Sequence, residues 1–196
     1  MASSYWADKA LEPKRNYKWY LSIQTGTTSK DLLQPWVVKS ASKPSLSIGE
    51  ASHSYINHTF YYPGKISWNT MDISVVDPGG PMNDTTKIIL NAIRSSGYAY
   101  PNEIANNAAA AGVTFSKSAA VDSLGTVVLR QIGGGPVGAG GISKVIDRWT
   151  LHNAWIKDVN FGSLSYDNED LTNISITLRY DWAVHNVGDG IGVPPL

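Results

Sequence analysis

Three groups of residues have types and spacings that suggest chemistry, and the first is rich in glycine. Gly133, Gly135 and Gly138 match the G-x-G-x-x-G pattern that binds dinucleotide phosphates. That function also requires a helix to begin at the third glycine, so that its N-terminus meets the pyrophosphate. Here Pro136 interrupts the pattern, and the next periodic segment alternates as a strand does. We therefore interpret residues 133–141 as a Gly-rich hairpin loop and predict no cofactor.

The second group contains metal-binding residue types. Asp167, Glu169 and Asp170 form an acidic run, but a calcium loop needs oxygen ligands at fixed spacing and a glycine at its sharp turn, which this run lacks. We interpret it as a solvated turn. His53 and His58 do not have the i, i+4 spacing of a zinc-binding helix, and on one strand they would point to opposite faces. The sequence therefore predicts no metal site.

The third group is the set of possible catalytic residues. His152 and His185 have no partner serine on a G-x-S-x-G turn, no phosphate-binding G-x-x-x-x-G-K-S/T motif occurs, and the chain has no cysteine. The remaining carboxylates and histidines show no grouping. The sequence therefore predicts that the protein is not an enzyme.

Aromatic residues leave one binding function open. Exposed rings on a β-sandwich can stack on sugars, and the candidates are Trp6, Tyr61, Tyr62 and Tyr100. Large aromatic side chains more commonly fill cores and subunit interfaces. Carbohydrate binding therefore remains an alternative from a different functional class.

Composition favours a protein that associates. Charged residues make up only 16% of the chain, and 16 basic residues balance 16 acidic ones, so the net charge is zero. There is no basic excess for tight nucleic-acid binding. The N-terminus lacks the apolar core of a signal peptide, and no apolar run is long enough to span a membrane, so we expect a protein made and kept in a cytoplasm. The three Asn-x-Ser/Thr triplets, at Asn57, Asn83 and Asn173, are then chance matches.

The positioning framework is clearest near the C-terminus. Residues 144–183 are predicted to form one long β-hairpin, with an outgoing strand over 145–156, a polar turn over 161–170 and a return strand over 172–182. The return strand alternates strictly. Its inward set is Ile174, Ile176, Leu178, Tyr180 and Trp182, and its polar set includes Ser175, Thr177, Arg179 and Asp181.

Elsewhere the pattern predicts one all-β dominated (α+β) domain over 1–196. It has two packed antiparallel sheets forming a β-sandwich or barrel, one flanking α-helix and a second short helix. Strands are expected at 17–24, with Tyr17 and Trp19 inward, and at 36–41, 65–68, 71–76, 113–115 and 126–132. Helices are expected from Asn83 or Asp84 to Gly97 and over 102–111. The remaining segments are an N-terminal arm (1–16), a projecting hairpin without its own core (45–63), a loop (116–125), the Gly-rich loop (133–141) and a loose tail (187–196).

Three segments resemble the tail tube proteins of contractile-tailed bacteriophages, which share their fold with the tube protein of type VI secretion. They are Ala10 to Ile23, Lys39 to Leu46, and Trp149 to Asp167 with Leu178 to Trp182. The first is similar to an arm that leads into an aromatic strand, the second to the segment before a long inter-ring hairpin, and the third to the closing hairpin. The second helix and the Gly-rich loop depart from the shorter tube proteins.

The resemblance implies a virion structural subunit, assembled in the host cytoplasm. Six copies would close a ring, and stacked rings would form a hollow tube through which DNA passes without specific binding. Implied partners are other copies, tail sheath, baseplate and tail-terminator proteins, with no membrane. A baseplate or tail-terminus adaptor of the same fold is the nearest alternative.

Two sets of residues become candidate contacts under this resemblance. The projecting hairpin would dock the next ring through Ser47, Glu50, His53, Tyr55, Asn57, Phe60 and Tyr62. A DNA channel needs short polar side chains of balanced or negative charge, because clustered Lys and Arg bind phosphate. The candidate lumen-lining residues are Ser175, Thr177, Arg179 and Asp181.

Overall fold

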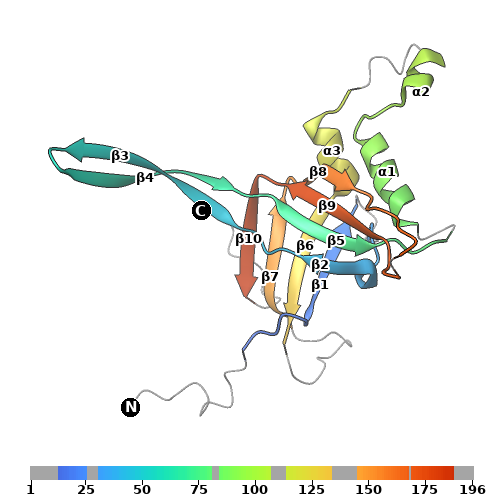
Figure 1. Ribbon diagram of the computed structural model, residues 1–196, viewed down its shortest axis with the longest axis horizontal. Coiled ribbons are helices and arrows are strands. Elements are labelled where there is room, and N and C mark those ends of the chain that lie inside the picture. The colour runs from blue at the N-terminus through green and yellow to red at the C-terminus, as the bar shows by residue number, and fades with distance from the viewer. Residues whose placement is uncertain are drawn as a thin grey trace.

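The computed structural model describes residues 13–25, 31–80, 84–106, 114–133, 145–167 and 169–187. Within these residues the strands form two four-stranded antiparallel sheets and a separate two-stranded hairpin. Figure 1 shows the two sheets packed face to face, the helices gathered at one end, and the hairpin extending away from the body. The predicted fold class is confirmed.

The first sheet, called sheet A, has the order β1-β6-β7-β10. Its strands are β1 (Trp19–Gln24), β6 (Thr126–Ile132), β7 (Val145–His152) and β10 (Trp182–Val187). The second, sheet B, has the order β2-β5-β9-β8. Its strands are β2 (Val38–Ala41), which follows a 3₁₀ turn at Pro35–Val37, β5 (Met71–Val76), β9 (Asn173–Arg179) and β8 (Trp155–Asn160). All neighbouring strands are antiparallel.

The core lies between the sheets, because each strand buries its alternate residues. Sheet A contributes Leu21, Ile23, Val127, Leu129 and Leu151, and sheet B contributes Met71, Ile73, Val75, Ile174, Ile176 and Leu178. The predicted inward set of the return strand is confirmed except for Trp182, which is exposed.

The sequence predicted one continuous ladder for the closing hairpin, and this prediction is wrong. Its outgoing strand breaks at Asn153, which has a left-handed φ of 55°, and its return strand breaks at Tyr180 and Asp181. The half before the break pairs β7 with β10 in sheet A, whereas the other half pairs β8 with β9 in sheet B. The hairpin therefore bends at a corner and joins the two sheets, with Ala154 and Tyr180 buried at the bend.

Three helices occur in the described residues: α1 (Thr85–Ser95), α2 (Pro101–Asn106) and α3 (Lys117–Leu124). Asp84 caps α1 by accepting a hydrogen bond from the Lys87 backbone N–H at 3.0 Å. The predicted apolar face of α1 is confirmed, because Ile89 and Ala92 are buried. Of the predicted second helix, residues 107–111 lie outside the described part.

Helix α3 corrects the predicted loop over 116–125. Ser116 caps it by accepting from the Ala119 N–H at 3.1 Å, and Leu124 enters the core. Gly125 then turns the chain into β6 with a φ of +79°, at a place where a Cβ atom would lie 2.0 Å from the Gln24 carbonyl oxygen. The segment is short and only weakly amphipathic, so the helix depends on tertiary packing against α1 and β8.

Several predicted boundaries are also wrong. Tyr17 is exposed and precedes β1, and Trp36 lies in the 3₁₀ turn instead of a strand. Residues 65–68 belong to the projecting hairpin, and Thr114 and Phe115 are not in a strand. The predicted features that lie outside the described residues are most of the N-terminal arm, the Gly-rich loop after Gly133 and the tail after Val187.

Candidate assembly surfaces

The projecting hairpin consists of β3 (Leu46–Tyr55) and β4 (His58–Trp68), joined at Ile56 and Asn57. Every residue of β3 is exposed, and in β4 only Thr59 and Trp68 are partly covered. At its root, Trp68 packs on Tyr180 with ring centroids 5.9 Å apart, and the Asn69 N–H donates to the Ser45 carbonyl at 2.9 Å. Beyond this root the hairpin extends away from the two sheets, with nearly all of its side chains exposed (Figure 1).

The strand register sorts the candidate inter-ring residues by face. Outside the root half, Ala51 pairs with Tyr62, His53 with Phe60 and Tyr55 with His58, so these side chains share one face. Ser47 lies on the same face of β3, whereas Glu50 is on the opposite face and Asn57 is at the tip. Five of the seven candidates therefore share one aromatic face: Ser47, His53, Tyr55, Phe60 and Tyr62.

The apolar surface changes face along the hairpin. A register shift between Ile48 and Glu50 marks a bulge. On the root side of it, the exposed apolar residues Leu46, Ile48 and Ile66 lie on the face opposite to Ser47. The hairpin thus has two apolar areas, one on each face. Because they face opposite ways, two different partner surfaces would be needed to bury both.

His53 and His58 share a face of the hairpin, contrary to the single-strand expectation. The turn at Ile56 and Asn57 places them on paired strands, and the His58 ring contacts Phe60 at a centroid distance of 4.7 Å. In the part of the chain that the structure describes, no three His, Cys, Asp or Glu side chains group closely enough to hold a metal ion.

The outer face of sheet B carries three of the four candidate lumen residues. Ser175 pairs with Ser74 and Asn160, and Thr177 pairs with Asp72 and Asp158. The Thr177 hydroxyl donates to the Asp72 carboxylate at 2.8 Å. Arg179, which is exposed, pairs with Trp155. This face therefore combines short polar side chains with both signs of charge.

Asp181 lies apart from the other three candidates. It follows β9 at the corner, where it accepts from the Lys117 ammonium at 2.6 Å and the Asn153 amide at 2.8 Å. The hydrogen bonds from Lys117 and Asn153, together with the positive charge of Lys117, hold the pKa of Asp181 below its usual value. This carboxylate therefore ties the N-terminal end of α3 to the bend between the sheets.

A buried carboxylate on β7 joins three segments that are distant in sequence. The side chain of Asp147 is only 4% exposed. It accepts from Lys14 at 2.9 Å and from His185, and the Lys43 ammonium lies 3.6 Å away. Gln131 completes the cluster, since it accepts from Lys43 at 2.9 Å and donates to the Arg15 carbonyl at 3.0 Å.

The electrostatics of this cluster favour a charged Asp147. Burial alone would raise the pKa of the carboxyl group, but the hydrogen bonds and positive charge from Lys14 and His185 outweigh burial, and the pKa lies below 3.8. Lys14 belongs to the segment before β1, and Lys43 lies two residues before the hairpin root at Ser45. Asp147 therefore fixes both segments to sheet A.

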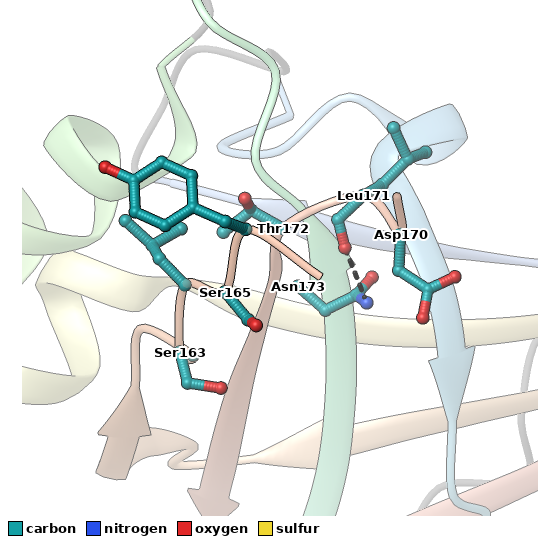
Figure 2. A pocket seen from close by; sticks show the side chains of 9 residues that line it. Ser163, Ser165, Asp170, Leu171, Thr172 and Asn173 are labelled. Atoms are coloured by element: carbon teal, nitrogen blue, oxygen red, sulfur yellow. Dashed lines mark hydrogen bonds between the residues drawn. The ribbon is translucent and has the colours of Figure 1, made fainter. Parts of the chain in front are cut away.

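Two hollows in the surface were not predicted. One lies within the β8–β9 loop and the other between β1 and β2, where Tyr17 and Trp19 line it. Figure 2 shows the first, with Ser163 and Ser165 on one side and Asp170, Leu171 and Thr172 on the other. The sequence does contain a hint, because apolar residues at Phe161, Leu164 and Tyr166 are unusual in a turn interpreted as polar.

The structure does not bring the carbohydrate-binding candidates together. Tyr61 and Tyr62 are consecutive on β4 and therefore point to opposite faces. Tyr100 precedes α2 and contacts Tyr98 and Arg94. Trp6 lies outside the described residues. None of the helices in the described residues is long and apolar enough to cross a membrane.

No protein-family model and no curated protein matches the sequence. Solved structures, in contrast, are similar over most of the chain. The tube terminating cap of the anti-feeding prophage has a TM-score of 0.60 at 14% identity, over 95% of this chain and 99% of that chain. A sheath-tube complex of the extracellular contractile injection system PVC has a TM-score of 0.59 at 14% identity, covering 89% of this chain and 92% of that one.

The anti-feeding prophage baseplate contains a third similar chain, with a TM-score of 0.58 at 11% identity, covering 90% of this chain and 97% of that chain. These similarities are in fold, since the identities are low. The chain has a tail-tube-like fold, as the sequence resemblance predicted.

Proposed function

We propose that this chain is a structural subunit of a phage tail tube, with no catalytic role, and that all of it forms one tube domain. Six copies close a ring, and rings stack into a hollow tube that conducts DNA. The observation that carries the proposal is the bare β3–β4 hairpin on a tail-tube-like fold. An isolated two-stranded hairpin is marginally stable in water, so this one needs a surface on another molecule.

The strand order of sheet B supports ring closure. Its edge strands are β2 and β8, and because every neighbouring pair is antiparallel, these two edges run in opposite directions. Pairing β8 of one copy with β2 of the next would continue the antiparallel order and satisfy the unpaired backbone groups of both edges. Such a contact is heterologous, and it closes a ring of six when each copy is rotated by one sixth of a turn from the last.

Stacking is assigned to the hairpin. Its aromatic face, with Ser47, His53, Tyr55, Phe60 and Tyr62, is proposed to contact the next ring, together with Asn57 at the tip. Glu50, on the opposite face, would approach a second neighbour. The contacts order a segment that has no core of its own, which makes assembly of each ring depend on the one before it.

The lumen is assigned to the outer face of sheet B. Ser175, Thr177 and Arg179 are proposed to line it, with Asp181 at its margin beside the corner. The cross-strand neighbours Asp72 and Asp158 supply negative charge beside Arg179 and the exposed Lys39 and Lys157 of the edge strands, and such mixed charge suits DNA that slides without binding. The proposed partners are sheath, baseplate and terminator proteins in a tail assembled in the host cytoplasm.

Electron microscopy of the purified protein in negative stain, at rising concentration, tests this function. Uniform rings and hollow tubes are expected. A protein that stays monomeric at all concentrations would reject self-assembly. If rings form but never stack, the result would favour the alternative hypothesis that this chain is an adaptor at the end of the tube.

A hairpin-shortened variant gives the matched comparison. Leu46 and Trp68 are cross-strand partners, so residues 47–67 can be replaced by an Asn-Gly turn while Trp68 keeps its contact with Tyr180. We expect this variant to form rings and no tubes. Tubes from the shortened variant would show that stacking uses another surface.

A further inference from the structure

The β8–β9 loop, residues 161–172 apart from Asn168, presents apolar side chains on a fixed base. Gly162 sits against Asn173, where a Cβ atom would lie 2.6 Å from the Asn173 carbonyl oxygen, and the Asp77 N–H donates to the Thr172 carbonyl at 3.0 Å. The Asn173 amide also donates to the Leu171 carbonyl at 2.9 Å (Figure 2). In contrast, Leu164 is 89% exposed and Tyr166 is fully exposed.

A loop with a rigid base loses little conformational entropy when it docks. The hydrophobic effect favours removing these two large exposed apolar side chains from water. Single exposed apolar residues are common on protein surfaces. Two large ones on a loop with a fixed base are instead typical of a loop that contacts another molecule.

The same chain has a hollow, lined partly by aromatic rings, that could receive such side chains. Between β1 and β2 lies an open hollow of about 620 Å³, in which the rings of Tyr17, Trp19 and Tyr20 lie beside Pro35, Val38 and Ala41 and beside the polar residues Asn16, Lys39 and Ser40. Tyr17 is 75% exposed. The hollow within the β8–β9 loop is of comparable size, about 510 Å³.

Charge is complementary between the two places. The loop carries Asp167 and Glu169 beside its apolar residues. Lys39 lines the pocket, and the Lys18 ammonium lies 6.0 Å from the centre of the Tyr17 ring. Opposite charges at the rim of an apolar contact select the partner and its orientation.

Their positions in sheet B also match. The loop follows the end of β8 at one edge of the sheet, and the pocket flanks β2 at the other edge. Since β8 and β2 are antiparallel, side-by-side pairing of two copies puts the end of β8 next to the start of β2, where Pro35 and Val38 lie.

We propose that the β8–β9 loop of one copy docks into the β1–β2 pocket of the next copy in the ring, with Leu164 and Tyr166 in the pocket and Asp167 facing Lys39. The partner is a second copy of this chain. The inference rests on the proposed function, because it specifies how the ring closes. The contact is heterologous, so each copy uses its loop on one side and its pocket on the other.

Two full-length variants test the docking. The loop variant carries Leu164→Ser and Tyr166→Ser, and the pocket variant carries Tyr17→Ser and Lys39→Glu. All four side chains are exposed, so both variants should fold like the wild type. Each of the two variants should need a protein concentration at least about 30-fold higher than the wild type to form rings, as measured by mass photometry. Phe115→Ser, which removes an exposed ring elsewhere, is the control and should form rings normally.

Mixing the two variants gives the decisive measurement. Each retains one intact surface, so an equimolar mixture should form a one-to-one dimer and stop there. Asp167→Lys should also lower ring formation, and combining it with Lys39→Glu should restore it. Failure of the wild type itself to form rings would reject the proposed function. Normal rings from the loop or pocket variant would overturn the docking alone.

Discussion

At the residue scale, Asp147 is the most consequential polar side chain in the structure. A buried carboxylate is costly unless it is paired and hydrogen-bonded. Lys14, Lys43 and His185 supply that pairing from three separate segments, and Gln131 links two of the same segments by accepting from the Lys43 ammonium and donating to the Arg15 carbonyl. The group therefore holds the N-terminal segment and the approach to the hairpin root on sheet A.

We expect Asp147→Asn to lower the free energy of unfolding by about 3 kcal/mol, because the change leaves positive groups near a buried site without their partner. Asp181→Asn is the matched control. Its carboxylate is in a partly exposed ion pair, for which the loss should stay below about 1 kcal/mol. Denaturant unfolding monitored by tryptophan fluorescence measures both. Equal losses in the two variants would contradict the assigned role of Asp147.

Asp147 also predicts a pH dependence with a definite sign. Since the pKa of this carboxyl group is lower in the folded state than the ordinary value of 3.8, its charged form stabilises the fold at higher pH. The contribution is complete above about pH 4 to 5 and is lost as the pH falls through the folded pKa. The stability difference between wild type and Asp147→Asn, followed from neutral pH to about pH 2.5, should shrink only below about pH 4. A difference that does not vary with pH would contradict this.

At the element scale, the tip of the hairpin stores strain. Ile56 has a φ of 56°, a left-handed conformation that β-branched residues rarely adopt, and its side chain is 85% exposed. Neither property helps an isolated subunit to fold. Strain of this kind is concentrated at functional sites, and an exposed apolar tip suits contact with another ring.

Ile56→Gly separates folding from assembly. Glycine removes the steric cost at positive φ but adds freedom to the unfolded chain, so the free energy of unfolding should change by less than about 1 kcal/mol. Tube length at a given concentration should nevertheless fall, because the apolar tip is gone. Electron microscopy of the variant beside Ile56→Val, which keeps an apolar β-branched tip, makes the comparison. Tubes of normal length from Ile56→Gly would exclude the tip from stacking.

The break in the closing hairpin is the other decisive feature at this scale. By bending at Asn153 and at Asp181, one pair of strands contributes to both sheets, and each half gains a different neighbour, β6 or β5. The bend also gives α3 a place beside β8, where Lys117 bonds Asp181. A corner shared by both sheets couples them mechanically.

At the scale of the whole molecule and its assembly, the balance of charge is the property that matters. A net charge of zero does not oppose association, and the exposed charges of sheet B are of both signs, with Asp72 and Asp158 beside Lys39, Lys157 and Arg179. If the outer face of this sheet lines the tube, DNA should not bind to assembled tubes at about 0.15 M salt.

Ser175→Lys should change that behaviour. Each subunit would add one positive charge to the proposed lumen, and co-sedimentation of short duplex DNA with assembled tubes should appear at low salt and fall steeply as salt rises. Ser95→Lys places the same charge on the exposed surface of α1 and serves as the control. Equal DNA retention by both variants would place Ser175 outside the lumen.

The sequence alone determined the features that depend on near neighbours in the chain. Strict alternation identified β9 with its buried Ile174, Ile176 and Leu178, and a capping Asp84 with an apolar face identified α1. The hairpin was recognisable because β3 and β4 favour strands yet lack a residue set that could form a core. These properties arise from backbone geometry and local hydrogen bonds, which neighbouring residues set.

Only the tertiary structure decided which sheet each half of the closing hairpin joins, because alternation is the same in a straight strand and on both sides of a corner. It also decided α3, whose weak pattern becomes helical through packing on α1 and β8. The Asp147 cluster is the feature least accessible from the sequence, since Lys14 and Asp147 are 133 residues apart in the chain. Contacts of that kind follow from how whole elements pack, and no local pattern encodes them.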